Sequence, residues 1–216
     1  TNWVGQDYFS PQAMAYLLYL VTIAVVLRGF RRREPTPPVL AAPLPRRAAL
    51  AVTVLLLAAM ASSHQITPFL AVVVLAGLVV FRQVRGWYLP AIAGGLTAVW
   101  AVTVGRGELQ RNAESLVDSF GQPIANAEQS LEKAATVVPA QQVISQAGRL
   151  VVVALALAAL FGVVRSWRSR TIDPAVLVIA ATPVALPLAT EFGGEAIFRV
   201  FLFAVPALAF LAASAL

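Results

Sequence analysis

The chain has 216 residues, of which 59% are hydrophobic and 12% charged, and its mean hydropathy is +0.79. This composition excludes an ordinary soluble domain and indicates a polytopic membrane protein. The lack of cysteine excludes disulfides and thiolate metal sites, and the formal net charge of +6 does not indicate nucleic-acid binding, because its placement along the chain follows the apolar runs.

Seven apolar runs predict an all-α fold, a polytopic bundle of about seven transmembrane helices. Gly94 and Gly95 predict a close helix contact in the fourth run. The runs cover residues 12–27, 48–61, 69–81, 87–104, 150–164, 174–188 and 196–216.

The sixth run and the two ends of the sequence carry further signals. Asp173-Pro174 opens the sixth run, and the prolines at 183 and 187 predict a break within it. The first residue is not methionine, and the last apolar run continues to Leu216. We therefore expect residues 1–216 to be a single transmembrane domain, a fragment of a longer membrane protein.

Two longer segments connect the runs. Residues 28–47 carry arginines and five prolines, which predict an extended linker. Residues 105–148 form a polar loop in which two apolar stripes predict short amphipathic helices. The stripes favour a lid packed on the membrane surface, and a lid that handles substrate is the alternative.

Charge placement predicts the orientation of the spans. If segments 28–47, 82–85 and 165–170 share one side, together with the neighbouring Asp173, that side holds eleven basic and two acidic residues, and the other holds five basic and eight acidic ones. The positive-inside rule makes the first side cytoplasmic, so the amino end and the loop 105–148 lie outside. Fifteen of the sixteen basic residues are arginine, which is typical of GC-rich genomes and indicates a bacterial cytoplasmic membrane.

The only histidine lies in a polar turn, residues 62–68, between the second and third runs. The 34 residues between Arg47 and Arg82 cover roughly 51 Å as helix, whereas two crossings of a membrane core need roughly 60 Å. We therefore expect this turn below the membrane surface, where polar groups need partners and often mark a site. His64 is a candidate proton carrier or metal ligand, and the alternative is that Ser, His and Gln cap helix ends. One histidine alone disfavours zinc.

Two further polar clusters fall on the same outer side. Asp7, beside Tyr8, is a candidate general base or metal ligand, or a solvated capping carboxylate. Glu191 and Glu195 flank two glycines, and they either surround one cation or sugar or belong to a solvated turn. Arg199 follows Glu195 by four residues, which fits an ion pair along the helix or a clamp for a phosphate or pyrophosphate head group.

Three segments carry a resemblance: NWVGQDYFSPQ at 2–12, SSHQITP at 62–68 and GGEAIFRV at 193–200. They resemble, in the same order, large multi-span membrane proteins of GC-rich Gram-positive bacteria that are described as uncharacterised or as glycosyltransferases of the GT-C type. Such enzymes use polyprenyl-phosphate sugars at the outer face and place acidic residues, in some cases with a divalent metal, in the first outer loop. Gln6 precedes Asp7, so their acidic pair is not intact here.

The resemblance implies an integral membrane glycosyltransferase acting at the outer face on a polyprenyl-phosphate-linked sugar, with Asp7 as the catalytic residue. No residue is assigned as a metal ligand, and a divalent cation stays open as cofactor. The expected partners are the lipid bilayer and the lipid-linked sugar. The predicted substrate-binding residues are Tyr8, His64, Gln65, Glu191, Glu195 and Arg199.

Two other functions stay open. A transporter or flippase of lipid-linked glycan predicts polar residues at mid-membrane depth. The spans hold few of these, namely Thr22, Thr53, Thr97 and Thr182. A non-catalytic membrane scaffold predicts that substitutions in the three polar clusters have little effect.

Overall fold

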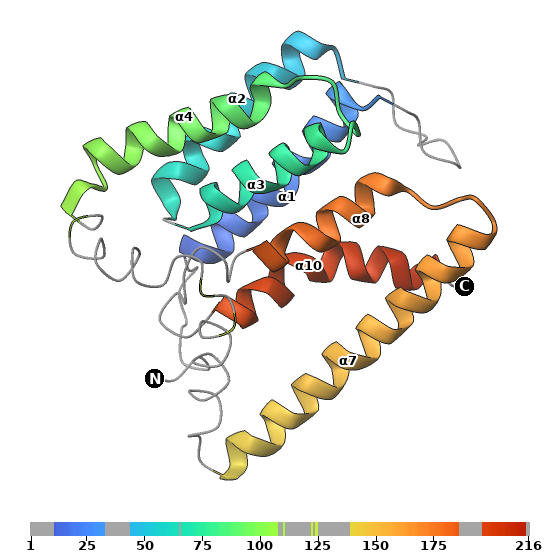
Figure 1. The fold of residues 1–216 in the computed structure, drawn as a ribbon. Helices are drawn as coiled ribbons and strands as arrows, with labels where there is room; N and C mark the ends of the chain where they lie inside the picture. The colour runs from blue at the N-terminus through green and yellow to red at the C-terminus, as the bar shows by residue number, and fades with distance from the viewer. Residues whose placement is uncertain are drawn as a thin grey trace. The chain divides into compact units, whose positions relative to one another are not determined.

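The structure is a computed structural model that describes residues 11–32, 44–64, 66–107, 110, 122, 124, 139–185 and 196–214. For 139–145, 149 and 196–199 it describes the backbone alone. The described residues form helices and no β-strand, so the predicted all-α class is confirmed (Figure 1). The chain divides into two compact units, unit 1 (Thr1–Arg111) and unit 2 (Asn112–Leu216).

Unit 1 contains four apolar helices that lie side by side (Figure 1). Helix α1 packs chiefly on α2, and α3 packs chiefly on α4, while α2 also contacts α4 and α1 contacts α3. A proline stands in the first turn of α3, where the helix leaves backbone N–H groups unbonded in any case. The four helices are α1 (Pro11–Phe30), α2 (Arg46–Ser63), α3 (Thr67–Val80) and α4 (Tyr88–Thr103).

The interior of unit 1 is filled by apolar side chains from all four helices. Gly29 allows α1 to approach α2, because a Cβ at this position would collide with the Cβ of Ala49. The close contact predicted at Gly94 and Gly95 is wrong, since a Cβ on either would meet no atom of the described chain within 4 Å. The large buried side chains include Tyr19, Val26, Phe30, Leu57, Met60, Leu70, Val74, Leu78 and Leu89.

Unit 2 is built around the long helix α7 (Pro139–Arg168), on which α10 (Ala196–Ala213) packs. Helix α8 (Pro174–Ala181) and the 3₁₀ turn η2 (Thr182–Ala185) also contact α10. Gly162 lies directly against the backbone of α10, because a Cβ there would collide with the carbonyl of Leu211. One turn further along, the Ser166 hydroxyl donates to the Ser214 hydroxyl at 3.2 Å.

Helices α3 and α7 end in the same local motif. After α3, the N–H of Gln83 donates to the carbonyl of Leu78 at 2.8 Å, and Arg82 has a φ of 57°. After α7, the N–H of Thr171 donates to the carbonyl of Ser166 at 2.9 Å, and Arg170 also has a φ of 57°. This is the Schellman arrangement, in which glycine usually occupies the left-handed position. An arginine there costs about 1–2 kcal/mol of backbone energy.

The helix boundaries differ from the predicted spans at two places. Helix α7 begins at Pro139, so the last ten residues of the predicted polar loop are helical, since Pro fits a first turn and Ala and Gln favour helix. Helix α8 ends at Ala181, and the 3₁₀ turn η2 follows it directly. Pro183 lies in this turn, so the predicted break at this proline is confirmed. Asp173 is the N-cap of α8, because its carboxylate accepts from the N–H of Ala175 at 3.0 Å. Pro187 and the predicted amphipathic helices of the loop lie outside the described residues.

Among the described residues, three helices are long and apolar enough to cross a membrane: Pro11–Phe30, Arg46–Ser63 and Gln146–Arg168. Four shorter apolar stretches are also helical: Thr67–Val80, Tyr88–Thr103, Pro174–Ala185 and Val200–Ala213. Each predicted span thus contains an apolar helix, and the number that cross a bilayer stays a prediction.

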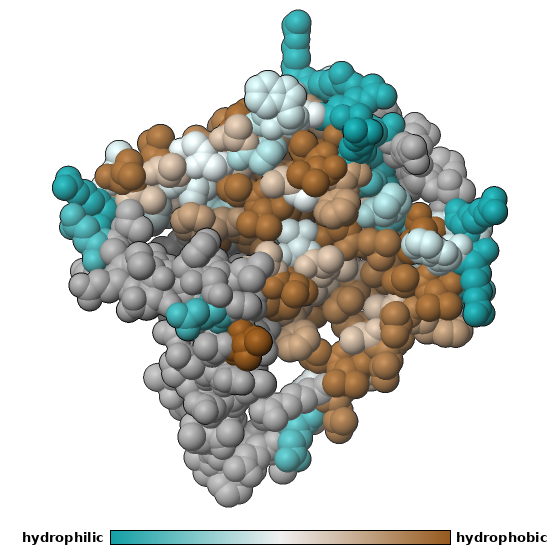
Figure 2. Space-filling view, viewed as in Figure 1, coloured by the Kyte–Doolittle hydropathy of each residue, from teal (hydrophilic) through white to brown (hydrophobic). Residues whose placement is uncertain are grey.

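The helices expose many large apolar side chains (Figure 2). On α7 the exposed residues recur at helical spacing along one face, away from the side that packs on α10. Trp87, just before α4, is 77% exposed. The exposed face of α7 includes Leu150, Val153, Leu157, Leu160, Phe161, Val164 and Trp167.

The close approach at Gly162 yields a stability prediction. We expect Gly162→Ala to lower the free energy of unfolding by about 1–3 kcal/mol, because the new methyl group meets rigid backbone rather than a movable side chain. Gly148→Ala is the matched control on the same helix, since a Cβ there meets nothing within 4 Å in the described chain. The measurement is thermal or denaturant unfolding in detergent micelles. Equal stability of the two variants would contradict this packing.

Candidate functional site

The His64 turn joins α2 to α3. The Nδ1 atom of His64 accepts from the backbone N–H groups of Ile66 at 3.4 Å and Thr67 at 3.3 Å. It also lies 3.0 Å from the hydroxyl of Thr67, whose side chain is fully buried. An Nδ1 that accepts backbone N–H bonds carries no proton, so the neutral ring has its proton on Nε2.

These bonds give His64 the role of an N-terminal cap for α3. The first N–H groups of a helix have no partner within the helix, and a side-chain acceptor just before the helix satisfies them. Ser62 and Ser63 do not bond to α3. Both hydroxyls donate to the carbonyl of Ala59 in α2, at 2.9 and 2.5 Å. Of the two interpretations of this turn, the geometry supports helix capping for His64.

The other predicted site residues are described less fully. Asp7, Tyr8, Gln65, Glu191 and Glu195 lie outside the described residues. The backbone of Arg199 lies in the first turn of α10, but its side chain is outside the description. The assembly of three polar clusters on one face therefore stays a prediction.

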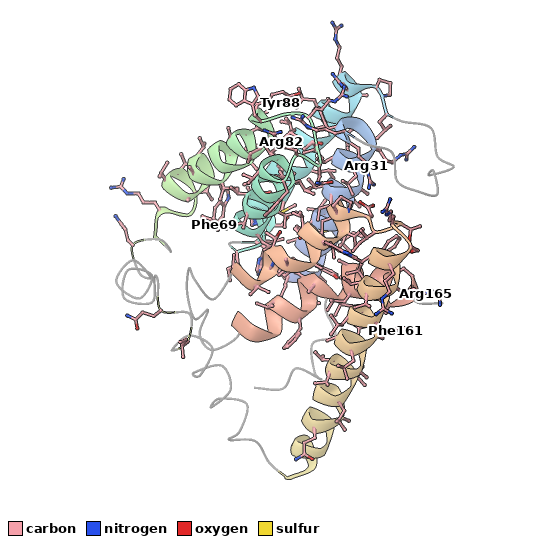
Figure 3. All side chains as sticks on the ribbon, turned by 45° about the vertical axis from the view of Figure 1, so that its right-hand side comes forward. Arg31, Phe69, Arg82, Tyr88, Phe161 and Arg165 are labelled. Carbon is pink, nitrogen blue, oxygen red and sulfur yellow. The ribbon has the colours of Figure 1, made fainter. Side chains whose placement is uncertain are left out.

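The basic segments of unit 1 meet at one end of the unit. The sequence predicted, from charge alone, that these segments share one side. The N–H of Arg32 donates to the carbonyl of Gln83 at 2.9 Å, and the N–H of Arg85 donates to the carbonyl of Phe30 at 2.6 Å. The Arg32 side chain adds a bond from Nε to the carbonyl of Val84 at 3.0 Å. The end of α1 is thereby fastened to the turn between α3 and α4, where Figure 3 shows Arg31 and Arg82.

The start of α2 belongs to the same end of unit 1. The N–H of Leu44, just before α2, donates to the carbonyl of Arg28 at 3.3 Å. We call the basic residues of this region the arginine end. No aspartate or glutamate occurs among the described residues of unit 1. The arginine end comprises Arg28, Arg31, Arg32, Arg46, Arg47, Arg82 and Arg85.

Sequence analysis did not single out these arginines as a site, because it counted them only for orientation. The bond from Arg32 to Val84 joins residues 52 positions apart, so no local pattern predicts it. The sequence did contain a signal for this site. Arginines occur in residues 28–47 and again in 82–85, and the two apolar runs between them have the length of a helical hairpin that returns the chain to its starting side.

The threonines inside the helices are mostly bonded within their own helix. Thr22 donates to the carbonyl of Leu18 at 2.7 Å, Thr97 to that of Ala93 at 2.8 Å, and Thr182 to that of Val178. Thr53 is the exception, since its buried hydroxyl has no hydrogen-bond partner in the described chain. Because these hydroxyls donate to carbonyls of their own helices, their hydrogen atoms are not available to a substrate or ion that passes between the helices.

The described residues form no cluster of metal-binding side chains. No group of three or more His, Asp or Glu side chains among them is placed to hold a metal ion. One open, apolar hollow lies beside Val163, Val164, Trp167 and Arg168 of α7.

The comparisons with known proteins return no match to a family model, a curated protein or a solved structure. No relative therefore indicates a reaction for this chain. Functional proposals rest on its own residues and on the resemblance of its three polar segments.

The cap at His64 can be tested by substitution. We expect His64→Ala to lower the free energy of unfolding by about 1 kcal/mol, because the first N–H groups of α3 lose their acceptor. His64→Asn should retain most of the stability, since asparagine is a good N-cap. Unfolding in detergent followed by circular dichroism measures both. If His64→Ala were as stable as the parent, the capping role would be wrong.

Proposed function

We propose that the chain is a multi-pass protein of a bacterial cytoplasmic membrane, with the arginine end on the cytoplasmic side and the His64 turn on the outer side. The observation that carries this proposal is the combination of apolar side chains exposed along the helices with arginines gathered at one end of unit 1. Basic residues are favoured on the cytoplasmic side of membrane proteins.

The energetics of the exposed face of α7 support a lipid environment. Burying a Leu, Val or Phe side chain is worth about 1.5–3 kcal/mol relative to water. Leu157, Leu160 and Phe161 alone are 61%, 59% and 61% exposed on this face. Lipid acyl chains remove such surface from water, and Trp167 near the arginines at the end of α7 suits the interfacial region.

The orientation can be tested with introduced thiols, because residues 1–216 contain no cysteine. Ser130→Cys and Ser169→Cys are near-isosteric changes, the first in the loop 105–148 that is predicted to lie outside and the second just after α7. We expect a membrane-impermeant maleimide to label the first variant in intact cells and the second only after the cells are opened. The reverse pattern would invert the orientation, and labelling of both in intact cells would contradict the spans.

Within this membrane frame, we propose that the protein transfers a sugar from a polyprenyl-phosphate donor at the outer face, with Asp7 as the catalytic residue. The support is the resemblance of the three segments to GT-C-type enzymes, together with the outer placement that charge distribution predicts for all three polar clusters. The cap at His64 makes this residue a positioning group for the start of α3, next to Gln65. Arg199 supplies a guanidinium suited to the lipid phosphate.

This reaction predicts a change in the lipid-linked sugar pool. We expect one polyprenyl-linked sugar to accumulate in cells that lack the full-length protein and in cells carrying Asp7→Asn at matched membrane levels. Mass spectrometry of membrane lipids measures the pool. Glu34→Gln is the control, because it removes a carboxylate on the opposite predicted side. An unaltered pool in the Asp7→Asn cells would overturn the assignment of that residue.

A non-catalytic scaffold is the second candidate. The observation that favours it is the structural use of His64, whose ring acts as a helix cap. A scaffold predicts an unaltered lipid pool in the null cells and in both variants, so the same experiment separates the two functions. A flippase finds less support, because three of the four mid-helix threonine hydroxyls are bonded within their own helices.

A further inference from the structure

The arginine end of unit 1 is a concentrated positive surface with few carboxylates near it in sequence. Between Tyr8 and Gly107 the chain has nine arginines and a single acidic residue, Glu34. Six members of the arginine end are exposed, and only Arg31 is half-buried. In the space-filling view, hydrophilic residues gather where α1 ends and α2 begins (Figure 2). A surface of this kind attracts anions at short range.

We infer that the arginine end binds the phosphate groups of anionic glycerophospholipids in the cytoplasmic leaflet. This inference rests on the proposed membrane location and orientation. A guanidinium presents a planar fork of donors that matches a phosphate and stays charged at every physiological pH. The arginines come from three helix ends that backbone hydrogen bonds hold together, so their positions are set before a lipid arrives.

Backbone groups at this end add to the same preference. Helices α2 and α4 both begin here, and their N-cap residues, Pro45 and Trp87, make no side-chain capping bond. The dipole of a helix start favours an anion. At α4 the dipole is the main contribution, because the N–H of Leu89 donates to the carbonyl of Gly86 at 3.0 Å and Pro90 has no N–H. By contrast, α3 begins at the other end of unit 1, where His64 occupies its N–H groups.

Arg82 lies at the surface of the arginine end. It occupies the left-handed position of the motif that ends α3, where glycine would relieve the backbone. Its side chain is exposed, and no described carboxylate in unit 1 accompanies it. Arg170 takes the same conformation after α7, so the backbone at Arg82 does not by itself distinguish the arginine end.

The surroundings identify a lipid rather than a soluble polyanion. Val80, Phe81 and Trp87 are 72%, 64% and 77% exposed in the same turn as Arg82 and Arg85. The ring of Tyr88 packs edge-on against Phe30 and Trp87, at centroid distances of 6.4 and 6.3 Å. Aromatic and basic side chains side by side are typical of the head-group region of a bilayer. Figure 3 shows Tyr88 and Arg82 at this end and Phe69 towards the other.

The test uses the full-length protein incorporated in bilayers of equal parts phosphatidylcholine and phosphatidylglycerol, then extracted in mild detergent. Mass spectrometry gives the ratio of the two lipids that remain bound. We expect phosphatidylglycerol to be enriched on the parent protein. Arg46→Gln, Arg82→Gln and Arg85→Gln combined should lower the enrichment at least about tenfold, since each arginine at an anionic surface accounts for roughly a fivefold change in affinity.

The matched control combines Arg165→Gln, Arg168→Gln and Arg170→Gln, which removes the same charge from a single helix end in unit 2. An equal loss of enrichment in both triple variants would overturn the inference, because net charge alone would then explain it. No enrichment on the parent protein would overturn it as well. The triple Arg→Lys variant at 46, 82 and 85 keeps the charge and should bind between the parent and the Gln variant, which guards against loss through misfolding.

Two further readouts separate the possible failures. Enrichment that persists in excess inorganic phosphate identifies the lipid as the ligand, and its loss to phosphate would overturn the lipid assignment. A parent protein that resists carbonate extraction but shows no lipid enrichment leaves the membrane proposal standing and removes only this inference. A protein that carbonate releases from membranes removes both.

Discussion

Unit 1 depends on the way its backbone is hydrogen-bonded at the arginine end. The carbonyls at the end of α1 accept from Leu44 and Arg85, and Arg32 bonds to the turn after α3 through both its backbone and its side chain. An unbonded backbone group in an apolar environment costs several kcal/mol. These few bonds therefore fix where α1 ends, where α2 starts and how the α3–α4 hairpin lies against them, and the packing of the four helices follows.

At the opposite end of unit 1, the imidazole ring of His64 accepts the hydrogen bonds that begin α3. His64 provides the acceptor for α3, while Ser62 and Ser63 bond back to α2, so the short connection between these helices uses its polar side chains locally. No arginine lies in this turn. The two ends of unit 1 thus differ in charge and in the type of contact, and such asymmetry orients a helical bundle in a membrane.

Sequence reasoning succeeded where the signal is local. It located an apolar helix in each predicted span, the start of the sixth run at Asp173-Pro174 and the break at Pro183, because each depends on a few neighbouring residues. It failed where helices meet: the close contacts occur at Gly29 and Gly162 rather than at Gly94 and Gly95. Which face of a helix meets a neighbour is a tertiary property, and many exposed positions are as apolar as the buried ones here. For the site, helix capping was one of the two alternatives stated for His64, whereas the bond between Arg32 and Val84 was not predicted.

The left-handed backbone conformation of Arg82, just after α3, has a consequence for the proposed membrane placement. Its motif is closed by six consecutive residues, so the helix stops there whatever the thickness of the lipid. Helix α3 has 14 residues, or roughly 21 Å of rise, whereas a bilayer core measures about 30 Å. The motif at Arg82 ends α3 on one side and the His64 cap begins it on the other, so the length of this helix is fixed. In the proposed membrane placement, the mismatch between α3 and the bilayer core is relieved by local thinning of the lipid beside this helix.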